Sequence, residues 1–458
     1  MNREFDTIAA ICTGLTESGI SVIRISGPDS IEAADRIFKT ASGLFPSAFR
    51  SNRMHLGQVI NEDGSILDEA MCCVFRAPHS YTAEDCVEIQ CHGGIRVTGL
   101  ILSLILSGNV RQAERGEFTK RAFLNGRIDL SQAESVMSLV SAVSDRGVSV
   151  SASGLLGVQG ERIREIREKI RFSTAHIEAA LDDPDEITYS PDDLLSEAEP
   201  VLLELKKVSS SSKVGKLLES GVDTVIAGLP NSGKSSLMNF LAGEETSIVT
   251  DIPGTTRDAV RARITLDGDI VLNLADTAGL RDSEDPIEKL GVEKSYAILN
   301  NADLVLFLVD GSVAQNEENM KIYGTLGDKK TVTVITKADL PAAFDIDSAP
   351  YAHRVSFSSV TGQGLTELRS MIRSVLDMDP DPEGKQAGLM ILTSRQETLI
   401  NRAISGLENA IASCGEGVTE DLYVSHLYDA YGALSEFLGE EVGDDIIDEI
   451  FRSFCMGK

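Results

Sequence analysis

GLPNSGKSSLMN, residues 228–239, decides the fold of the region around it. The β-branched run VDTVIAG directly before it predicts a buried strand, and SSLMNFLAG has the spacing of a helix. Between them stands G-x-x-x-x-G-K-S, with Gly228, Gly233, Lys234 and Ser235 at the defined positions. Such glycines let backbone N–H groups wrap a phosphate chain, while the lysine reaches the β- and γ-phosphates and the serine hydroxyl binds Mg²⁺. The stretch predicts a P-loop; the alternative is a glycine-rich turn.

Three later segments complete the pattern of a guanine-nucleotide site. IVLNLAD ends at Asp276, whose carboxylate can hold Mg²⁺ through water, and Gly279 can offer its N–H to a γ-phosphate and release it after hydrolysis. VTVITKADL places Asp339 after a strand, where a carboxylate accepts hydrogen bonds from the N1–H and amine of guanine. VSFSSVTGQGL supplies Ser358 and Ser359, whose backbone can cap the base. Four such motifs in order, each after a predicted strand, predict a GTPase.

Two positions depart from the pattern of the small signalling GTPases. Thr336 stands where N-K-x-D motifs have Asn, so one supporting hydrogen bond is in question although the preference for guanine is not. Leu280 stands where those GTPases place a Gln that orients the attacking water. The domain therefore hydrolyses GTP slowly by itself, or another group acts. Asn231, inside the P-loop, is one candidate through a bound cation; the alternative is that it only holds the loop in place.

Composition sets the class of protein. The 458 residues predict about three domains, and the 42% hydrophobic and 25% charged content is ordinary for a soluble globular protein. No apolar run approaches the ~20 residues of a membrane span, and VTGLILSLILSG (97–108) predicts a buried helix. The N-terminus shows no secretory signal pattern, and the seven cysteines include no C-x-x-C pair. These features predict a cytoplasmic protein.

The net charge of −29 argues against a chain that wraps a nucleic acid by itself. Affinity for phosphate backbones comes mostly from Lys and Arg, which are outnumbered here by Asp and Glu. If the protein acts on RNA, it is expected to rely on a partner or on a small local basic patch.

The rest of the chain predicts two further kinds of domain. Residues 1–123 alternate short strands and helices and predict a compact α+β domain. Residues 124–220 and 378–458 carry apolar residues at helical spacing and predict the two parts of one helical bundle. Between these parts lies the predicted G domain, 221–377, of the Ras-like P-loop α/β type. The predicted fold is therefore multidomain, α/β and all-α, with a discontinuous bundle that a nucleotide switch can move at both of its connections.

Several motifs together resemble the MnmE (TrmE) family of tRNA-modification GTPases. They are GLPNSGKSS, TDIPGTTRD, DTAGLR, TKAD, SYTAEDCVEIQCHGG, GEFTKRAFLNGRIDLSQAE and the final Cys-Met-Gly-Lys, so the resemblance runs the whole chain. TDIPGTTRD is shared with ribosome-assembly GTPases, and the two ends of the chain favour MnmE. The resemblance implies a K⁺-stimulated GTPase whose two G domains meet face to face across the nucleotides.

The resemblance also implies ligand sets around the nucleotide. K⁺ takes the place of an arginine finger, and its ligands would be Asn231, Thr250, Ile252 through its carbonyl, and Thr255; Mg²⁺ would be bound by Ser235 and Thr256. Glu288 matches the residue that orients the catalytic water and would act with Lys234 and Asn231; the alternative is an ordinary charge on an acidic surface helix. The predicted GTP contacts are Asn231, Ser232, Gly233, Lys234, Ser235, Ser236, Thr250, Asp251, Ile252, Pro253, Gly254, Thr255, Thr256, Asp276, Thr277, Ala278, Gly279, Thr336, Lys337, Asp339, Ser358 and Ser359.

The N-terminal region resembles a tetrahydrofolate-binding domain that also mediates dimerisation and is similar in fold to the aminomethyltransferase of glycine cleavage. The resemblance implies that Arg24, Glu88, Arg127 and Lys458 contact 5,10-methylenetetrahydrofolate, or 5-formyltetrahydrofolate as its analogue. An Arg/Glu pair suits the edge of a pterin, and cations suit a glutamate tail. The alternative for Arg24 is a surface charge at a strand edge. LTESGIS (15–21) replaces the family's usual Gly/Arg-rich run, and Arg127 replaces its common Lys.

The chain ends in the pattern Cys-x-Gly-Lys. In the family this tail reaches the folate site, so Cys455 becomes a candidate catalytic nucleophile, and the neighbouring Lys458 would lower its pKa.

The resemblance implies a homodimeric GTPase that modifies C5 of the wobble uridine of certain tRNAs. Its partner would be an FAD-containing flavoprotein of the MnmG (GidA) type, in an expected heterotetramer that grips tRNA mainly through that partner. The carbon of the aminomethyl or carboxymethylaminomethyl group would come from methylenetetrahydrofolate. Two alternatives stay open: a ribosome-assembly or regulatory GTPase switch, and an aminomethyl-transfer enzyme with an inserted regulatory G domain. Neither a folate-like domain nor a Cys-x-Gly-Lys terminus is expected of the switch.

Overall fold

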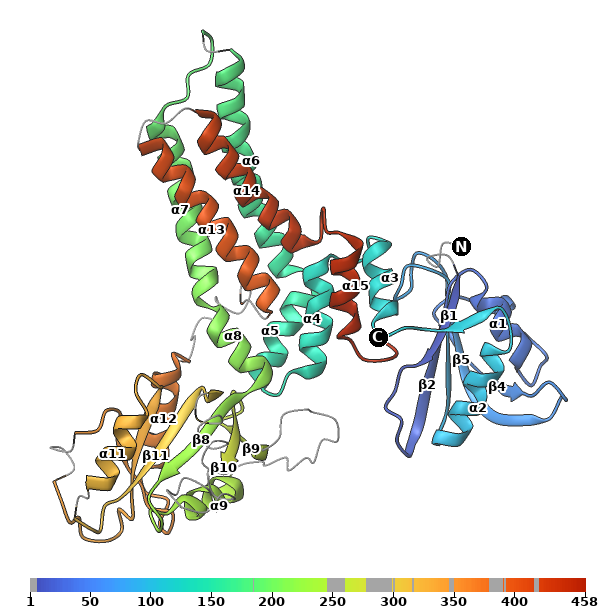
Figure 1. The fold of residues 1–458 in the computed structure, drawn as a ribbon. Coiled ribbons are helices and arrows are strands. Elements are labelled where there is room, and N and C mark those ends of the chain that lie inside the picture. Colours follow the sequence, from blue (N-terminus) through green and yellow to red (C-terminus); the bar gives the residue numbers. More distant parts are fainter. Residues whose placement is uncertain are drawn as a thin grey trace, which may run out of the picture. The chain divides into compact units, whose positions relative to one another are not determined.

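The computed structural model describes residues 6–183, 185–244, 260–276, 299, 301–314, 317–345, 350–378, 390, 393–415 and 420–458 (Figure 1). The chain divides into two compact units, Met1–Met137 with Gly432–Lys458, and Ser138–Tyr431. The first unit thus joins the N-terminal region to the end of the chain. The domain boundaries expected at 123, 220 and 377 stay predictions.

The first unit is built on a seven-stranded sheet with the order β3-β4-β5-β6-β2-β1-β7. Its strands are β1 (Thr7–Ile11), β2 (Ser18–Ser26), β3 (Phe38–Lys39), β4 (Met54–Ile60), β5 (Ile66–Phe75), β6 (Cys86–Gly93) and β7 (Val110–Gln112). Neighbouring strands are antiparallel except β1 and β7, which are parallel. Side chains alternate between the faces, so Ile23 and Ile25 enter the core while Arg24 lies on the opposite face, across from Glu88.

Two helices cover the core face of this sheet, α1 (Ser30–Ile37) and α2 (Ile95–Leu106) (Figure 1). The predicted helix over 97–108 is present, but it is not buried all round: Ile101 and Ile105 are fully buried, whereas Leu100 is exposed. A helix packed on a sheet buries one side, and its other side faces water. A short 3₁₀ turn, η2 (Pro46–Ala48), completes this layer.

The end of the chain packs within the same unit. Helix α15 (Asp444–Arg452) contacts α3 (Glu117–Leu124), and Phe451 and Phe454 share an apolar cluster with Ala122. Farther on, a Cβ added at Gly457 would lie 2.8 Å from the Cα of Cys12, just after β1. The C-terminal tail therefore runs along α3 to the end of the first strand.

The second unit contains most of the helical part of the chain. Outside its sheet region, the described helices of this unit are α5 (Asp145–Leu155), α6 (Val158–Asp182), α7 (Pro191–Ser210), α8 (Ser212–Ser220), α13 (Ser394–Gly415) and much of α14 (Glu420–Leu438), and α4 (Leu130–Ser141) ends in it. The long helices α6, α7, α13 and α14 lie alongside one another, so segments from before and after the predicted G domain pack together (Figure 1). Among the described residues, no helix is long and apolar enough to cross a membrane.

Between α8 and α13 lies a six-stranded sheet with the order β13-β12-β11-β8-β10-β9. Its strands are β8 (Val222–Gly228), β9 (Val260–Leu266), β10 (Ile270–Asp276), β11 (Leu304–Asp310), β12 (Thr331–Thr336) and β13 (Arg354–Ser356), all parallel except β9. Helices α9 (Lys234–Glu244) and α12 (Leu365–Leu376) pack on one face and α11 (Glu317–Thr325) on the other. This is a doubly wound sheet, and it agrees with the predicted P-loop α/β domain. Since β8 lies between β10 and β11, its carboxyl end is a topological switch point, where such sheets bind ligands.

Candidate functional site

The P-loop connects the carboxyl end of β8 to α9 at the switch point. Gly228 has φ +147°, and a Cβ there would lie 2.5 Å from the carbonyl oxygen of Leu308 on β11, so a larger residue would displace backbone. Asn231 is exposed and has φ +66°, a left-handed conformation that Asn tolerates better than most residues. Strand, glycine-rich loop and helix thus follow one another as the sequence predicts.

The side chains of Lys234 and Ser232 lie in the loop in two different environments. The Lys234 Nζ donates hydrogen bonds to the carbonyl oxygens of Gly228 and Leu229, 2.8 and 2.7 Å away. The loop backbone therefore binds the positively charged ammonium group of this lysine. The Ser232 side chain is buried, and its hydroxyl has no hydrogen-bond partner among the described residues. An unsatisfied buried hydroxyl costs about 1–3 kcal/mol, and a bound phosphate or water would relieve it. Ser235, on the first turn of α9, is exposed.

The two segments predicted to recognise the base are joined by a hydrogen bond. The Ser358 Oγ donates to the Asp339 Oδ1 at 2.6 Å, and the backbone N–H groups of Val360 and Thr361 donate to the same Ser358 oxygen. Asp339 is exposed, and Ser359 is half-buried next to Ser358. The carboxylate is therefore oriented before any base arrives.

Lys337 completes this end of the sheet. It has φ +60°, and its ammonium pairs with Asp310 at the end of β11. Burial would raise the pKa of the Asp310 carboxyl, but hydrogen bonds from Lys337 and Ser312 outweigh burial and hold that pKa below its ordinary value. The sequence motifs did not indicate that Asp310 belongs to this site. The only feature of the sequence that could have indicated it is its position at the end of an apolar run.

Thr336 makes the supporting contact that the sequence left in question. Its hydroxyl donates to the carbonyl oxygen of Ser232 at 2.8 Å, and the carbonyl oxygen of Val309 lies 3.3 Å away. Its side chain also lies 3.5 Å from where a Cβ on Gly233 would be. Thr336 therefore connects the predicted base-recognition segment to the P-loop by a hydrogen bond. This is the supporting role expected of the Asn that N-K-x-D motifs have at this position.

We expect Thr336→Val to release bound GDP roughly 5- to 10-fold faster than the wild type, because the change leaves the buried Ser232 carbonyl without its donor, a loss of about 1 kcal/mol. Stopped-flow fluorescence with a labelled GDP measures the rate. Thr336→Ser keeps the hydroxyl and is the matched control. A Val variant as slow as the Ser variant would show that this hydrogen bond does not hold the site together.

Part of the predicted nucleotide site lies outside the described residues. That part is Thr250, Asp251, Ile252, Pro253, Gly254, Thr255, Thr256, Thr277, Ala278, Gly279 and Glu288, together with Leu280. Asp276 ends β10 opposite Ile226 of β8, so its backbone stands at the same sheet edge as the P-loop. Of the predicted metal ligands, Ser235 and Asn231 are described, and the roles of all of them stay predictions.

In the first unit, Arg24 and Glu88 form a partly buried ion pair. They are register partners on β2 and β6, and the Arg24 Nε donates to the Glu88 Oε1 at 2.9 Å. The two side chains are 16% and 21% exposed, and the guanidinium carbon of Arg24 lies 5.4 Å from the ring centroid of Phe118 on α3. The alternative of a surface charge at a strand edge is wrong, since β2 lies inside the sheet between β6 and β1.

Arg127 and Lys458 approach the same place from two other segments. The guanidinium carbon of Arg127 lies 5.2 Å from the ring centroid of Tyr81, and that of Arg24 lies 4.5 Å from it. Burial raises the pKa of the Cys12 thiol, and the positive charges of Arg24 and Lys458 oppose part of that rise. The structure therefore places Arg24, Glu88 and Arg127 around Tyr81, and it places Gly457, the residue before Lys458, against Cys12.

Tyr81 and Cys12 are the residues of this cluster that the sequence analysis missed. The only signal was that Tyr81 stands inside SYTAED, a motif used for the family resemblance. Its neighbour Ser80 has a buried hydroxyl with no hydrogen-bond partner among the described residues, so the cluster fits a ligand with polar groups. Cys455 is exposed, and its carbonyl accepts a hydrogen bond from the Gly116 N–H at 3.4 Å; its role as a nucleophile stays a prediction.

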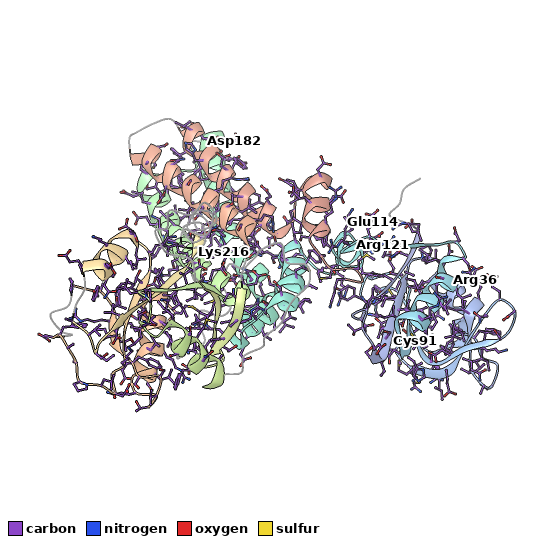
Figure 2. All side chains as sticks on the ribbon, turned by 60° about the horizontal axis from the view of Figure 1, so that its bottom comes forward. Arg36, Cys91, Glu114, Arg121, Asp182 and Lys216 are labelled. Carbon is purple, nitrogen blue, oxygen red and sulfur yellow. The ribbon has the colours of Figure 1, made fainter. Side chains whose placement is uncertain are left out.

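A second charged cluster includes two residues of α3, Glu117 and Arg121. Arg121, almost fully buried, pairs with Asp6, Glu84 and Glu117, and Arg111 pairs with Asp6 and Glu117. Both arginines, Glu84 and Glu117 border a cavity of about 360 Å³ that also reaches Asp448 and Arg452 of α15. Figure 2 labels Arg121 together with Glu114, another residue of the cavity wall. The cluster joins the start of the chain, α3 and the loop before β6.

Comparison with known proteins decides the family. A family model described as the GTP-binding protein TrmE N-terminus matches residues 7–127, and one described as the MnmE helical domain matches residues 130–455. The chain belongs to the MnmE (TrmE) family. The two models cover Arg24, Glu88, Arg127, the P-loop and the C-terminal helices, so the MnmE resemblance seen in the sequence motifs is confirmed.

Curated relatives match over the full length. The tRNA modification GTPase MnmE of Carboxydothermus hydrogenoformans is 41% identical over 464 residues, which cover 99% of each chain. The MnmE of Finegoldia magna is 39% identical over 459 residues, covering 99% of this chain and 100% of the relative. Among solved structures, the G domain of the T. maritima FeoB iron transporter is 28% identical, covers 33% of this chain and 96% of its own, and has a TM-score of 0.27.

Proposed function

We propose that the protein is a GTP hydrolase that acts in tRNA modification. The observation that carries this proposal is the Thr336–Ser232 hydrogen bond, which ties a guanine-recognition segment to a P-loop in a chain of the MnmE family. Full-length relatives named as tRNA modification GTPases support the pathway.

In this proposal the chain's own residues bind and orient the nucleotide. The P-loop N–H groups hold the phosphate chain, and Lys234 turns from the Gly228 and Leu229 carbonyls toward the β- and γ-phosphates. Asp339, held by Ser358, accepts the N1–H and amine of guanine. Mg²⁺ on Ser235 and Thr256, and K⁺ on Asn231, Thr250, Ile252 and Thr255, would neutralise the charge of the phosphates. Glu288 would orient the attacking water.

We expect GTP turnover to be roughly 10-fold or more faster in KCl than in NaCl at equal ionic strength, because K⁺ would supply the positive charge that an arginine finger supplies elsewhere. Phosphate release measures the rate. Asn231→Ala should lose the advantage of KCl, whereas Asn239→Ala, on the exposed side of α9, should keep it. Equal rates of GTP turnover by the wild type in KCl and NaCl would contradict the K⁺ assignment.

We further propose that the first unit binds 5,10-methylenetetrahydrofolate through Arg24, Glu88, Arg127 and Lys458. Their convergence on Tyr81 and Cys12 and the unsatisfied Ser80 hydroxyl support this. The folate would supply the carbon added at C5 of the wobble uridine, with Cys455 as a candidate nucleophile.

The partner in this scheme is an FAD-containing flavoprotein of the MnmG (GidA) type, bound by a cytoplasmic homodimer in a heterotetramer. The net charge of −29 supports a tRNA grip made mainly by that partner.

Deletion of the gene followed by mass spectrometry of the nucleosides of total tRNA tests the pathway. The expected result is a loss of C5-substituted wobble uridines that the wild-type gene restores and Asp276→Ala does not. An unchanged nucleoside profile, in a strain without a second copy, would favour a ribosome-assembly or regulatory switch, which shares every G-domain motif.

A further inference from the structure

Tyr81 stands between groups that the proposed folate site requires. The guanidinium carbons of Arg24 and Arg127 lie 4.5 and 5.2 Å from its ring centroid, and the Arg127 Nη1 donates to the Tyr81 carbonyl at 2.9 Å. The Tyr81 hydroxyl is 2.9 Å from the Thr119 Oγ1 on α3. One aromatic ring therefore connects β2, α3 and the segment after α3.

The Tyr81 ring offsets the repulsion between the guanidinium groups of Arg24 and Arg127. Two guanidinium groups near one point repel each other, and the Glu88 carboxylate pairs with Arg24. The negative face of an aromatic ring attracts a cation within about 6 Å of its centroid, and tyrosine is among the better rings for this contact. The Tyr81 ring can therefore attract both guanidinium groups without a second carboxylate beside them. A second carboxylate would neutralise the positive charge that attracts an anionic ligand.

We propose that Tyr81 is a positioning residue of the folate site, a role that rests on the proposed binding of folate. Its ring positions Arg24, together with Glu88, to hydrogen-bond with the edge of the pterin. The same ring positions Arg127 to contact an anionic group of the same ligand. Thr119 orients the ring through its hydroxyl. The proposal concerns the ring's charge distribution rather than its volume.

A pair of variants of equal shape separates these two properties. Tyr81→Phe keeps the negative face, and Tyr81→pentafluorophenylalanine reverses it while filling the same space. Calorimetry with 5-formyltetrahydrofolate should show an affinity within roughly 3-fold of wild type for the Phe variant and roughly 10- to 30-fold weaker for the fluorinated one. Tyr431→Leu, which removes a comparable contact with Arg167 at 5.4 Å, should leave the affinity unchanged.

The outcomes separate the inference from the function on which it rests. No binding by the wild type would overturn the folate assignment and the role of Tyr81 with it. Binding by the wild type, with equal affinities for the Phe and fluorinated variants, would overturn the role of Tyr81 alone. GTP turnover should be the same in all these proteins, because the nucleotide site contains none of these residues.

A different observation carries a second inference, on the turn that joins β9 to β10. On one side of this turn, Arg373 of α12 pairs with Asp267 and Asp269 at 3.2 and 2.9 Å, and Arg369 pairs with Asp267 at 3.0 Å. On the other side, the N–H of Asp145, the first residue of α5, donates to the Gly268 carbonyl at 3.0 Å.

The contact with α5 is close and continues into the core. Gly268 has φ +79°, and a Cβ there would lie 3.0 Å from the Asp145 carboxylate, so glycine permits the approach. Val150 of α5 lies in the same apolar cluster as Leu266 and Ile270. Movement of the turn would therefore move α5 with it.

The two strands of this hairpin connect to the motifs expected to bind the metal ions and the γ-phosphate. TDIPGTTRD ends two residues before β9, and Asp276, the first residue of DTAG, ends β10. We infer that the β9–β10 turn transmits the nucleotide state to α5. This inference does not depend on folate binding.

Asp145→Pro tests it, because proline at the first position of a helix removes the N–H donor while keeping the helix. Hydrogen exchange of α5 amides should differ roughly 3-fold or more between the GDP and GTP-analogue states of the wild type, and that difference should vanish in Asp145→Pro and in Gly268→Ala. Gly327→Ala is the matched control: φ is +56° there, but an added Cβ meets no atom within 4 Å, so it should keep the difference.

Two results would overturn the inference. One is a wild-type α5 whose exchange is the same in both nucleotide states. The other is a nucleotide-dependent difference that survives in both Asp145→Pro and Gly268→Ala. Nucleotide affinity should be unchanged in all variants.

Discussion

Asp339→Asn is expected to lower the affinity for GTP by roughly 100-fold or more and to create affinity for xanthosine triphosphate. The Asp339 carboxylate, held at 2.6 Å by the Ser358 hydroxyl, is an acceptor for the N1–H and amine of guanine. An amide in its place presents N–H groups to those donors, whereas xanthine offers a carbonyl oxygen to the amide. Equilibrium titration with fluorescent analogues of both nucleotides gives the two affinities.

Asp328→Asn is the matched control for this change, since Asp328 is an exposed carboxylate of the same domain, on the loop that follows α11. Both affinities should be unchanged in that variant. If Asp339→Asn still prefers GTP, the base must be recognised by groups other than this carboxylate.

Arg121→Met is expected to lower the free energy of unfolding of the first unit by about 3–5 kcal/mol. Arg121 is 4% exposed, and its removal takes away the cation that pairs with Glu84 and leaves Arg111 to pair with both Asp6 and Glu117. The chain has no tryptophan, so urea unfolding is best followed by circular dichroism together with hydrogen exchange of β1.

Lys120→Met provides the comparison on the same helix. Lys120 pairs with Asp448, but the two side chains are 29% and 43% exposed, and such a pair contributes about 1 kcal/mol or less. Equal losses in the Arg121 and Lys120 variants would show that burial of the Arg121 cluster does not matter.

The stability that the Arg121 cluster provides should depend on pH. Burial would raise the pKa values of the Glu117 and Asp6 carboxyls, but Arg111 and Arg121 outweigh burial and hold both below their ordinary values. A carboxyl whose folded pKa is depressed stabilises the fold above its unfolded pKa of roughly 4, and that stabilisation is lost as the pH falls through the folded pKa. The wild type should therefore lose more stability on acidification below about pH 4 than Arg121→Met does.

The family resemblance indicated Arg24, Glu88, Arg127 and Lys458, and the structure brings them to one place. Sequence alone could not indicate Tyr81 as their common neighbour, because an aromatic ring in a motif is more often part of a core than of a charge cluster. Nor could it indicate the Arg121 cluster, whose members Asp6 and Arg121 stand 115 residues apart.

By itself the sequence determined the P-loop, the strand before it and the helix after it, and the order of the later guanine-nucleotide motifs. These features depend on local chemistry: glycine conformations, β-branched runs and contacts within a few residues of chain. Only the tertiary structure decided that Thr336 donates to Ser232, 104 residues away, and that the tail runs to Cys12. Such contacts depend on sheet register and on which faces pack together, and these are set by the whole core rather than by any one segment.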